Sequence, residues 1–108
     1  GGKTQGLANV EVLFTADYMD YMAGWARRYE GEIIPSDRPH ENIFLFKRPI
    51  GVTTGILPWN FPFFLVARKA APALITGNTI VIKPSQLTPE NAYVFAQIVE
   101  EAGSKWTG

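Results

Sequence analysis

The sequence predicts an α/β fold in which a long amphipathic helix precedes part of a doubly wound parallel sheet. Two observations lead to this class: apolar residues recur at helical spacing near the N-terminus, and the second half alternates between strand and helix patterns. The 108 residues, 46% hydrophobic and 19% charged, suit one compact domain. We divide it into a long helix and its exit (1–34), a loop and strand (35–50) and a βαβα unit (51–108).

The N-terminal segment has the spacing of a long amphipathic helix. Its apolar residues lie three or four positions apart, which places them along one stripe of the helix surface. They are Leu7, Val10, Phe14, Tyr18, Tyr21, Trp25 and Tyr29. Gly24 costs this helix about 1 kcal/mol relative to alanine, and Gly31 is its predicted end. We expect its aromatic residues Tyr18, Tyr21 and Trp25 to face the core or another copy of the chain.

A loop and a short strand follow the helix. Two prolines within five residues, Pro35 and Pro39, prevent regular backbone hydrogen bonding, so this segment is predicted to be a loop. The next apolar run, residues 43–46, is predicted to be a strand, with Pro49 near its end.

The second half begins with a strand, a helix and a strand. Residues 51–57 are mostly β-branched and apolar, which predicts a buried strand. Residues 63–75 have helical spacing, and Pro72 either kinks this helix or lies near its last turn. Residues 79–82 form a short β-branched strand. A helix of this length between two neighbouring strands is typical of a right-handed parallel βαβ unit.

A second helix closes the unit. Thr88 is a hydroxyl N-cap and Pro89 suits the first helical position, where its missing N–H is not needed. Gly103 is the predicted end of this helix.

Charge and cysteine content exclude several classes of function. Ten Lys and Arg residues balance ten Asp and Glu residues, with no basic cluster, which argues against binding to nucleic acid or to an anionic membrane. The chain has no cysteine, so disulfides and thiolate metal sites are excluded. No transmembrane run, signal peptide or metal-ligand spacing is visible, and we expect a cytoplasmic protein without a metal site. Lys3 and Thr4 resemble the end of a phosphate-binding loop, but a helix-entry turn explains them better.

Polar residues follow both predicted strands of the βαβ unit. Asn60 comes after the first strand, and Lys83, Ser85 and Gln86 come after the second. The carboxyl ends of parallel strands meet at one edge of a sheet, where ligands bind in open α/β folds. An ammonium, a hydroxyl and amides suit an anionic, hydroxyl-rich ligand such as a nucleotide. Turn-forming residues and a surface lysine are the alternative explanation.

Several motifs in this half resemble the NAD(P)-dependent aldehyde dehydrogenase superfamily. They are Ile56-Leu57-Pro58-Trp59-Asn60-Phe61-Pro62, Ala71-Pro72-Ala73-Leu74, Thr76-Gly77-Asn78-Thr79-Ile80-Val81-Ile82-Lys83-Pro84-Ser85 and Thr88-Pro89. The resemblance extends to Gly103 and implies the N-terminal part of a partial Rossmann-like cofactor domain. Residues 14–18 and 25–32 look most like bacterial lactaldehyde and glycolaldehyde dehydrogenases.

The resemblance implies a role for the segment after the first strand. Asn60 matches the family's oxyanion-hole asparagine, whose amide donates to the oxygen on which negative charge develops. Trp59 matches the stretch that lines the pyrophosphate and ribose side of the cofactor. The backbone of this stretch belongs to Ile56, Leu57 and Pro58.

The resemblance also implies how the second strand end binds NAD. Lys83 matches the lysine that bonds the adenosine ribose hydroxyls, with Ser85 beside it. Gln86 departs from the family, because NAD-preferring members commonly have a glutamate there, so NADP use is also allowed. The tail, residues 104–108, departs too, because the family continues with proline and glycine.

The family's nucleophile is a cysteine, and a glutamate activates the water that releases the acid. The chain has no cysteine, so we expect it to be inactive alone and to be a fragment of an enzyme that oxidises a small hydroxyaldehyde such as lactaldehyde with NAD(P). The alternative is a non-catalytic nucleotide-binding or oligomer-interaction module. We expect the intact enzyme to be a homo-oligomer, a dimer or tetramer. The isolated chain is expected to expose apolar interface around Tyr18, Tyr21 and Trp25 and at residues 43–46, and to be poorly soluble or to self-associate.

Overall fold

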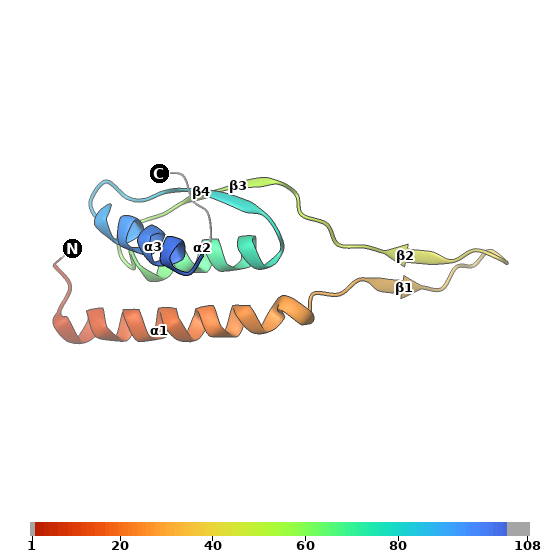
Figure 1. The fold of residues 1–108 in the computed structure, drawn as a ribbon, viewed down its shortest axis with the longest axis horizontal. Helices are drawn as coiled ribbons and strands as arrows, with labels where there is room; N and C mark the ends of the chain where they lie inside the picture. The colour runs from red at the N-terminus through yellow and green to blue at the C-terminus, as the bar shows by residue number, and fades with distance from the viewer. Residues whose placement is uncertain (1, 104–108) are drawn as a thin grey trace.

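The computed structural model describes residues 2–103, so the divergent tail, 104–108, lies outside the described residues. The elements in chain order are α1 (Gln5–Ala23), the 3-10 helix η1 (Gly24–Arg27), β1 (Glu32–Ile34), β2 (Ile43–Leu45), β3 (Val52–Ile56), α2 (Phe64–Ile75), β4 (Thr79–Lys83) and α3 (Glu90–Glu101). This order confirms a mixed α/β chain that begins with a long helix. The molecule extends over 64 × 28 × 25 Å because the β1–β2 hairpin projects from one end (Figure 1).

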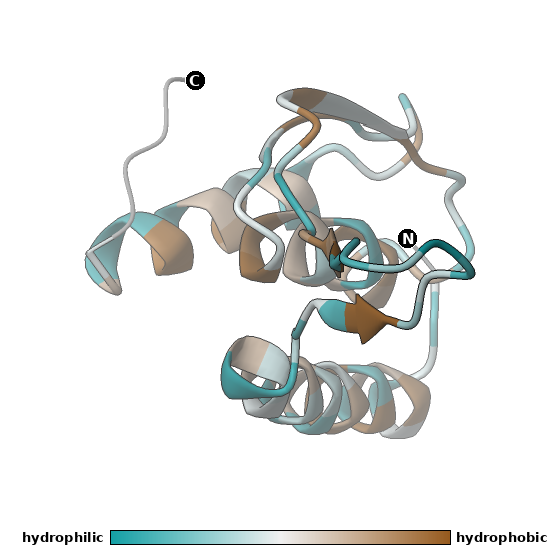
Figure 2. Ribbon diagram, turned by 90° about the vertical axis from the view of Figure 1, so that its right-hand side faces the viewer, coloured by the Kyte–Doolittle hydropathy of each residue, from teal (hydrophilic) through white to brown (hydrophobic). Residues whose placement is uncertain are grey.

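The helices are stacked below one face of a two-stranded parallel sheet. α2 packs against β3 and β4, α1 packs against α2, and α3 lies beside α2 on the same side of the sheet (Figures 1 and 2). A doubly wound sheet has helices on both faces, and within residues 2–103 only this face is covered. None of the helices in this range is both long and apolar enough to span a lipid bilayer.

The parallel pairing of β3 with β4 confirms the predicted βαβ unit. Val52 pairs with Thr79 and Ile56 pairs with Lys83. Asn78, in the turn before β4, fixes this register because its Oδ1 accepts hydrogen bonds from the backbone N–H groups of Ile50 and Gly51, at 2.6 and 3.0 Å. The side chain therefore connects the start of one strand to the start of the other.

The two faces of the sheet differ in exposure. The prediction that the first strand, β3, is buried was right for the face toward α2 and wrong for the outer face. Gly55 is buried against α2, where Lys69 Cβ lies 3.4 Å from the position that a Cβ would take. Alternate residues point to the outer face, where Val52, Ile56 and Val81 are 74%, 72% and 59% exposed. The alternation follows the period of two in a strand. Only the helical side of the sheet is covered in the described part of the chain.

The long helix is shorter than predicted, and only part of its apolar stripe packs on α2. Regular helix ends at Ala23, a 3-10 turn begins at Gly24, and Gly31 lies beyond it at the start of the hairpin. Glycine is a poor helix former, which explains the change of helix type at this position. The face that packs on α2 combines small and polar residues with larger apolar ones, and Phe14 at its edge contacts Phe64. It includes Ala8, Glu11, Thr15, Tyr18 and Met19.

Most of the predicted apolar stripe of α1 therefore faces solvent. Leu7, Val10 and Phe14 are exposed by more than half, as is Tyr21. Two rings of the stripe nevertheless contact Phe64 of α2, because Phe14 lies 4.7 Å from its ring centroid and Tyr18 packs edge-on against it at 5.6 Å. The predicted exposure of apolar surface here is confirmed for Tyr21 and Trp25, which are 57% and 37% exposed, while Tyr18 belongs to the α1–α2 contact.

A two-stranded antiparallel hairpin forms the projecting end of the molecule. The prediction of a strand at 43–46 is confirmed by β2, but its partner β1 was missed. Ile33 pairs with Phe44, and both side chains are more than half exposed. In Figure 2 both strands are coloured as hydrophobic over part of their length, although neither contributes a buried residue.

The two helices of the βαβα unit begin and end close to the predicted residues. Pro72 lies inside α2, in its last turns, as predicted. Pro89 has helical dihedral angles, but Thr88 makes no capping hydrogen bond, contrary to expectation. Its hydroxyl is buried without a hydrogen-bond partner among the described residues. Gly103 ends α3 with φ at +92°, a conformation that glycine adopts without strain.

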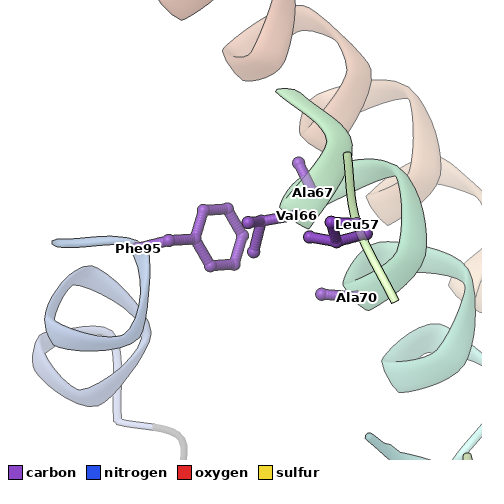
Figure 3. Packing of buried hydrophobic residues seen from close by; sticks show 5 residues of the cluster. All are labelled: Leu57, Val66, Ala67, Ala70 and Phe95. Atoms are coloured by element: carbon purple, nitrogen blue, oxygen red, sulfur yellow. The ribbon is translucent and has the colours of Figure 1, made fainter. Parts of the chain in front are cut away.

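The hydrophobic core lies between the sheet, α2 and α3. Figure 3 shows Phe95 of α3 directed at Val66 of α2, with Leu57, just after β3, on the other side. Ala67 and Ala70 complete this buried cluster. These contacts fix the ends of β3 and β4 relative to the start of α3, and those ends carry the predicted site.

Candidate functional site

The carboxyl ends of β3 and β4 bring the two predicted site segments to one edge of the sheet. Ile56 and Lys83 are register partners, and the Leu57 N–H donates to the Lys83 carbonyl at 3.1 Å. The loop with Trp59 and Asn60 leaves from one strand and the loop with Ser85 leaves from the other. The common edge expected for parallel strands is thus present.

A cavity of about 410 Å³ lies beside the first of these loops. The start of α1, the loop after β3 and the start of α3 form its walls. Its polar and aromatic lining comprises Lys3, Glu11, Trp59, Asn60, Thr88 and Asn91. Three segments far apart in the sequence thus converge on this cavity.

Asn60 presents a free amide at this cavity. The residue is exposed, and within residues 2–103 its side chain makes no hydrogen bond. Trp59, next to it, is 59% exposed. An amide that no other protein group uses is available to donate to a bound oxygen.

Lys83, Ser85 and Gln86 form a second group at the same edge, outside the lining of the cavity. Lys83 and Gln86 are exposed, whereas Ser85 is half-buried. The Ser85 hydroxyl oxygen accepts a hydrogen bond from the Leu87 N–H at 3.2 Å, and its carbonyl accepts one from the Thr88 N–H at 3.2 Å. Ser85 thus shapes the turn and keeps its O–H available as a donor.

The residues between Ile56 and Trp59 divide between the core and the surface. Leu57 is 6% exposed and its side chain belongs to the core, so only its backbone can face a ligand. Ile56 is 72% exposed, on the outer face of the sheet, and Pro58 is exposed as well.

Glu11 is a buried carboxylate of this site that sequence reasoning missed. Its Oε2 accepts a hydrogen bond from the Lys3 ammonium at 2.6 Å, and its Oε1 accepts from the backbone N–H groups of Phe63 and Phe64, at 2.9 and 3.1 Å. Its backbone partners lie 52 and 53 positions away. No local sequence signal could have marked this residue.

The surroundings of Glu11 hold it in its charged form. Burial raises the pKa of the Glu11 carboxyl, but the hydrogen bonds from Lys3, Phe64 and Phe63 outweigh burial and leave the pKa below its usual value. A lowered pKa in the folded state means that the carboxylate stabilises the fold at neutral pH. This contribution is lost as the pH falls from the ordinary glutamate range through the lowered pKa.

The start of α1 is a helix-entry turn, as expected. The Thr4 hydroxyl accepts a hydrogen bond from the Leu7 N–H at 3.4 Å and caps α1. The Lys3 ammonium forms an ion pair with Glu11 of α1, and its nitrogen lies 4.1 Å from the centroid of the Phe61 ring. Within residues 2–103, no group of three or more His, Cys, Asp or Glu side chains could hold a metal ion.

Comparisons with known proteins identify the family of this chain. Residues 1–105 match the sequence model of the aldehyde dehydrogenase family. The chain is 79% identical over 103 residues to lactaldehyde dehydrogenase of Escherichia coli K12, which covers 95% of this chain and 22% of that protein. It is 45% identical over 102 residues to D-glyceraldehyde dehydrogenase (NADP(+)) of Thermoplasma acidophilum, covering 94% of this chain and 21% of that protein. The crystal structure of E. coli lactaldehyde dehydrogenase matches with a TM-score of 0.90 and 78% identity, over 94% of this chain and 21% of that one.

The chain therefore belongs to the aldehyde dehydrogenase family, as its motifs indicated. Its predicted similarity to lactaldehyde dehydrogenases is confirmed by the E. coli relative. The chain spans about a fifth of the length of the curated relatives it matches.

Proposed function

We propose that the chain is part of an enzyme that oxidises a small hydroxyaldehyde such as lactaldehyde to its carboxylate with NAD(P). The observation that carries this proposal is the 79% identity to E. coli lactaldehyde dehydrogenase over 95% of the chain. We also infer that the 108 residues alone are inactive, since they contain no cysteine to serve as the family's nucleophile. The cytoplasmic location stays a prediction.

Within this enzyme we assign Asn60 to the oxyanion hole. Its amide has no partner among the described residues and lies at the wall of the cavity. When a nucleophile adds to an aldehyde, negative charge develops on the carbonyl oxygen. A donor held in place before the reaction stabilises this charge without reorganisation.

We assign cofactor binding to the edge formed by the ends of β3 and β4. The residues fit the adenosine ribose of a dinucleotide, because Lys83 offers an exposed ammonium and Ser85 an unused hydroxyl donor, beside the exposed amide of Gln86. Trp59 and the backbone of residues 56–58 would face the pyrophosphate and ribose side. When bound, NAD(P) supplies an acceptor for the hydride that leaves the aldehyde carbon.

We infer that β3 and β4 form part of a larger, doubly wound Rossmann-like sheet in the cofactor domain of the intact enzyme. The support is the outer face of the pair, where apolar side chains lie open to solvent. They are Val52, Ile56 and Val81. A sheet with both faces covered buries such residues.

We further propose that the intact enzyme is a homo-oligomer, a dimer or tetramer. Exposed apolar side chains on the projecting hairpin support this assignment, since patches of this kind mark interaction surfaces. They include Ile33, Phe44 and Phe46, which are 77%, 56% and 74% exposed.

Sequencing the coding DNA on both sides of this segment tests the proposal, followed by assay of the encoded protein with lactaldehyde and NAD. We expect a continuous reading frame that contains a cysteine and a downstream glutamate, and lactaldehyde-dependent reduction of NAD. A frame that closes next to these residues would favour the alternative, a non-catalytic nucleotide-binding or oligomer-interaction module.

Replacing Gln86 with glutamate is expected to shift cofactor preference toward NAD. A carboxylate at this exposed position accepts hydrogen bonds from ribose hydroxyls and repels a 2′-phosphate. A repulsion of about 1 kcal/mol corresponds to a change of about fivefold to tenfold in the ratio of kcat/KM for NAD to that for NADP. The measurement is a titration of both cofactors against the full-length enzyme.

The matched control is Gln97→Glu, which makes the same change of charge at an exposed position of α3. The control should leave the cofactor ratio unchanged. If Gln86→Glu also leaves it unchanged, this residue does not select the cofactor.

A further inference from the structure

We infer that Glu11, together with Lys3, is a positioning residue that holds the Asn60 loop in place for catalysis. This inference rests on the role proposed for Asn60. Its starting point is the contact between the buried Glu11 carboxylate, on α1, and the backbone at the start of α2.

The start of α2 lacks the local acceptor that a helix needs. The first N–H groups of a helix have no partner within it, and a Ser, Thr, Asp or Asn at the N-cap usually accepts from them. Here the N-cap is Phe63, whose side chain has no acceptor, and α2 begins at Phe64. The turn before it is closed by the Leu65 N–H, which donates to the Phe61 carbonyl.

Glu11 supplies the missing acceptor from another helix. Its Oε1 accepts from the N–H groups of Phe63, the N-cap, and of Phe64, the first residue of α2. These N–H groups at the helix start have no acceptor within the helix. The negative charge also faces the positive end of the α2 dipole. α1 thus caps α2, and Asn60, one residue before Phe61, is left with a free amide.

Lys3 holds the other side of the same loop. Its ammonium donates to Glu11 Oε2 at 2.6 Å and lies 4.1 Å from the centroid of the Phe61 ring, a cation–π distance. Glu11 is 7% exposed, and the side chain of Lys3 is 22% exposed, so water screens this ion pair weakly. The pair contacts three of the four residues that follow Asn60.

Glu11 and Asn60 have different roles in this arrangement: Glu11 holds the loop, and Asn60 donates a hydrogen bond. Both carboxylate oxygens of Glu11 are engaged within the protein, Oε1 with the loop and Oε2 with Lys3, which suits a positioning role. Asn60 keeps its donor free. A small displacement of a catalytic group lowers the rate steeply, because the donor must already be where charge develops.

Steady-state kinetics of the full-length enzyme test the inference, with Glu11 variants made both in the wild-type enzyme and in an Asn60→Ala enzyme. Glu11→Ala is expected to lower kcat with lactaldehyde by about 10- to 100-fold and to leave the KM for NAD unchanged. Glu11→Gln, which keeps an acceptor oxygen for Phe63 and Phe64, should recover most of this loss. In an Asn60→Ala background, Glu11→Ala should change kcat less than about twofold, because the group that it positions is gone.

The outcomes separate this inference from the proposed function. Equal losses from Glu11→Ala in both backgrounds, or a parallel rise in the KM for NAD, would overturn the positioning role while leaving Asn60 as the oxyanion donor. Full activity of the Asn60→Ala enzyme would overturn both. Circular dichroism checks the fold of each variant. If Glu11→Ala does not fold, Glu11→Asp replaces it under the same criteria, since it keeps the charge but shortens the reach by one carbon.

Discussion

Replacing Asn60 with alanine is expected to lower kcat of the full-length enzyme by about 10²- to 10³-fold, with little change in the KM for NAD. The amide is positioned at the cavity wall and has no partner within residues 2–103, so its removal takes away a donor without breaking a contact of the fold. The interaction strengthens as charge develops on the aldehyde oxygen, so its loss appears in kcat. Steady-state kinetics with lactaldehyde measure the effect.

A second variant and a control variant test this prediction further. Asn60→Asp should be at least as damaging as alanine, because a carboxylate has no donor and repels the developing charge. Asn9→Ala removes an exposed amide from α1 and should leave kcat unchanged. An Asn60→Ala enzyme that retains more than about half of its kcat is incompatible with an oxyanion role.

The βαβα unit could be predicted from the sequence because its signals are local. β-branched runs, helical spacing and Pro89 at a helix start each describe a few adjacent residues. Parallel pairing then places the ends of β3 and β4 at one edge, which is why Asn60 and Lys83 were expected there. Residue types at strand ends thus sufficed to find the candidate edge.

The errors concern features that distant segments decide. Apolar spacing found the stripe of α1 but could not show how packing divides it: Phe14 and Tyr18 contact α2, while Leu7 and Val10 stay exposed. β1 was missed because its pairing with β2, and no pattern of its own, defines it.

Glu11 illustrates the same limit within the site. A carboxylate on an amphipathic helix is normally solvated, and nothing near it in sequence distinguishes it. Its burial follows from Phe63 and Phe64, which need an acceptor and lie more than 50 positions away. Thr88 shows the opposite case, in which a local signal was present but misleading. The sequence predicts a capping hydrogen bond from Thr88, yet its hydroxyl is buried without a partner among the described residues.

Truncation of Phe95 to alanine is expected to cause the largest loss of stability among single changes in the described core, about 3–5 kcal/mol. The residue is 7% exposed, and its ring meets Phe63 edge-on at a centroid distance of 5.7 Å. No other residue of α3 is fully buried. Its ring is therefore the main attachment of α3 to α2 (Figure 3).

Urea denaturation of the 108-residue chain, at concentrations where sedimentation shows a monomer, is followed by far-ultraviolet circular dichroism and measures this loss. Phe46→Ala is the matched control, because the same truncation at a 74% exposed position should change the free energy of unfolding by less than about 0.5 kcal/mol. Phe95→Leu keeps most of the apolar volume and should fall between the two. Equal shifts for Phe95→Ala and Phe46→Ala would mean that α3 is not held by this ring. Because Thr88 and Asn91 at the start of α3 line the same cavity as Asn60, the attachment of this helix also determines whether this part of the cavity wall stays in place.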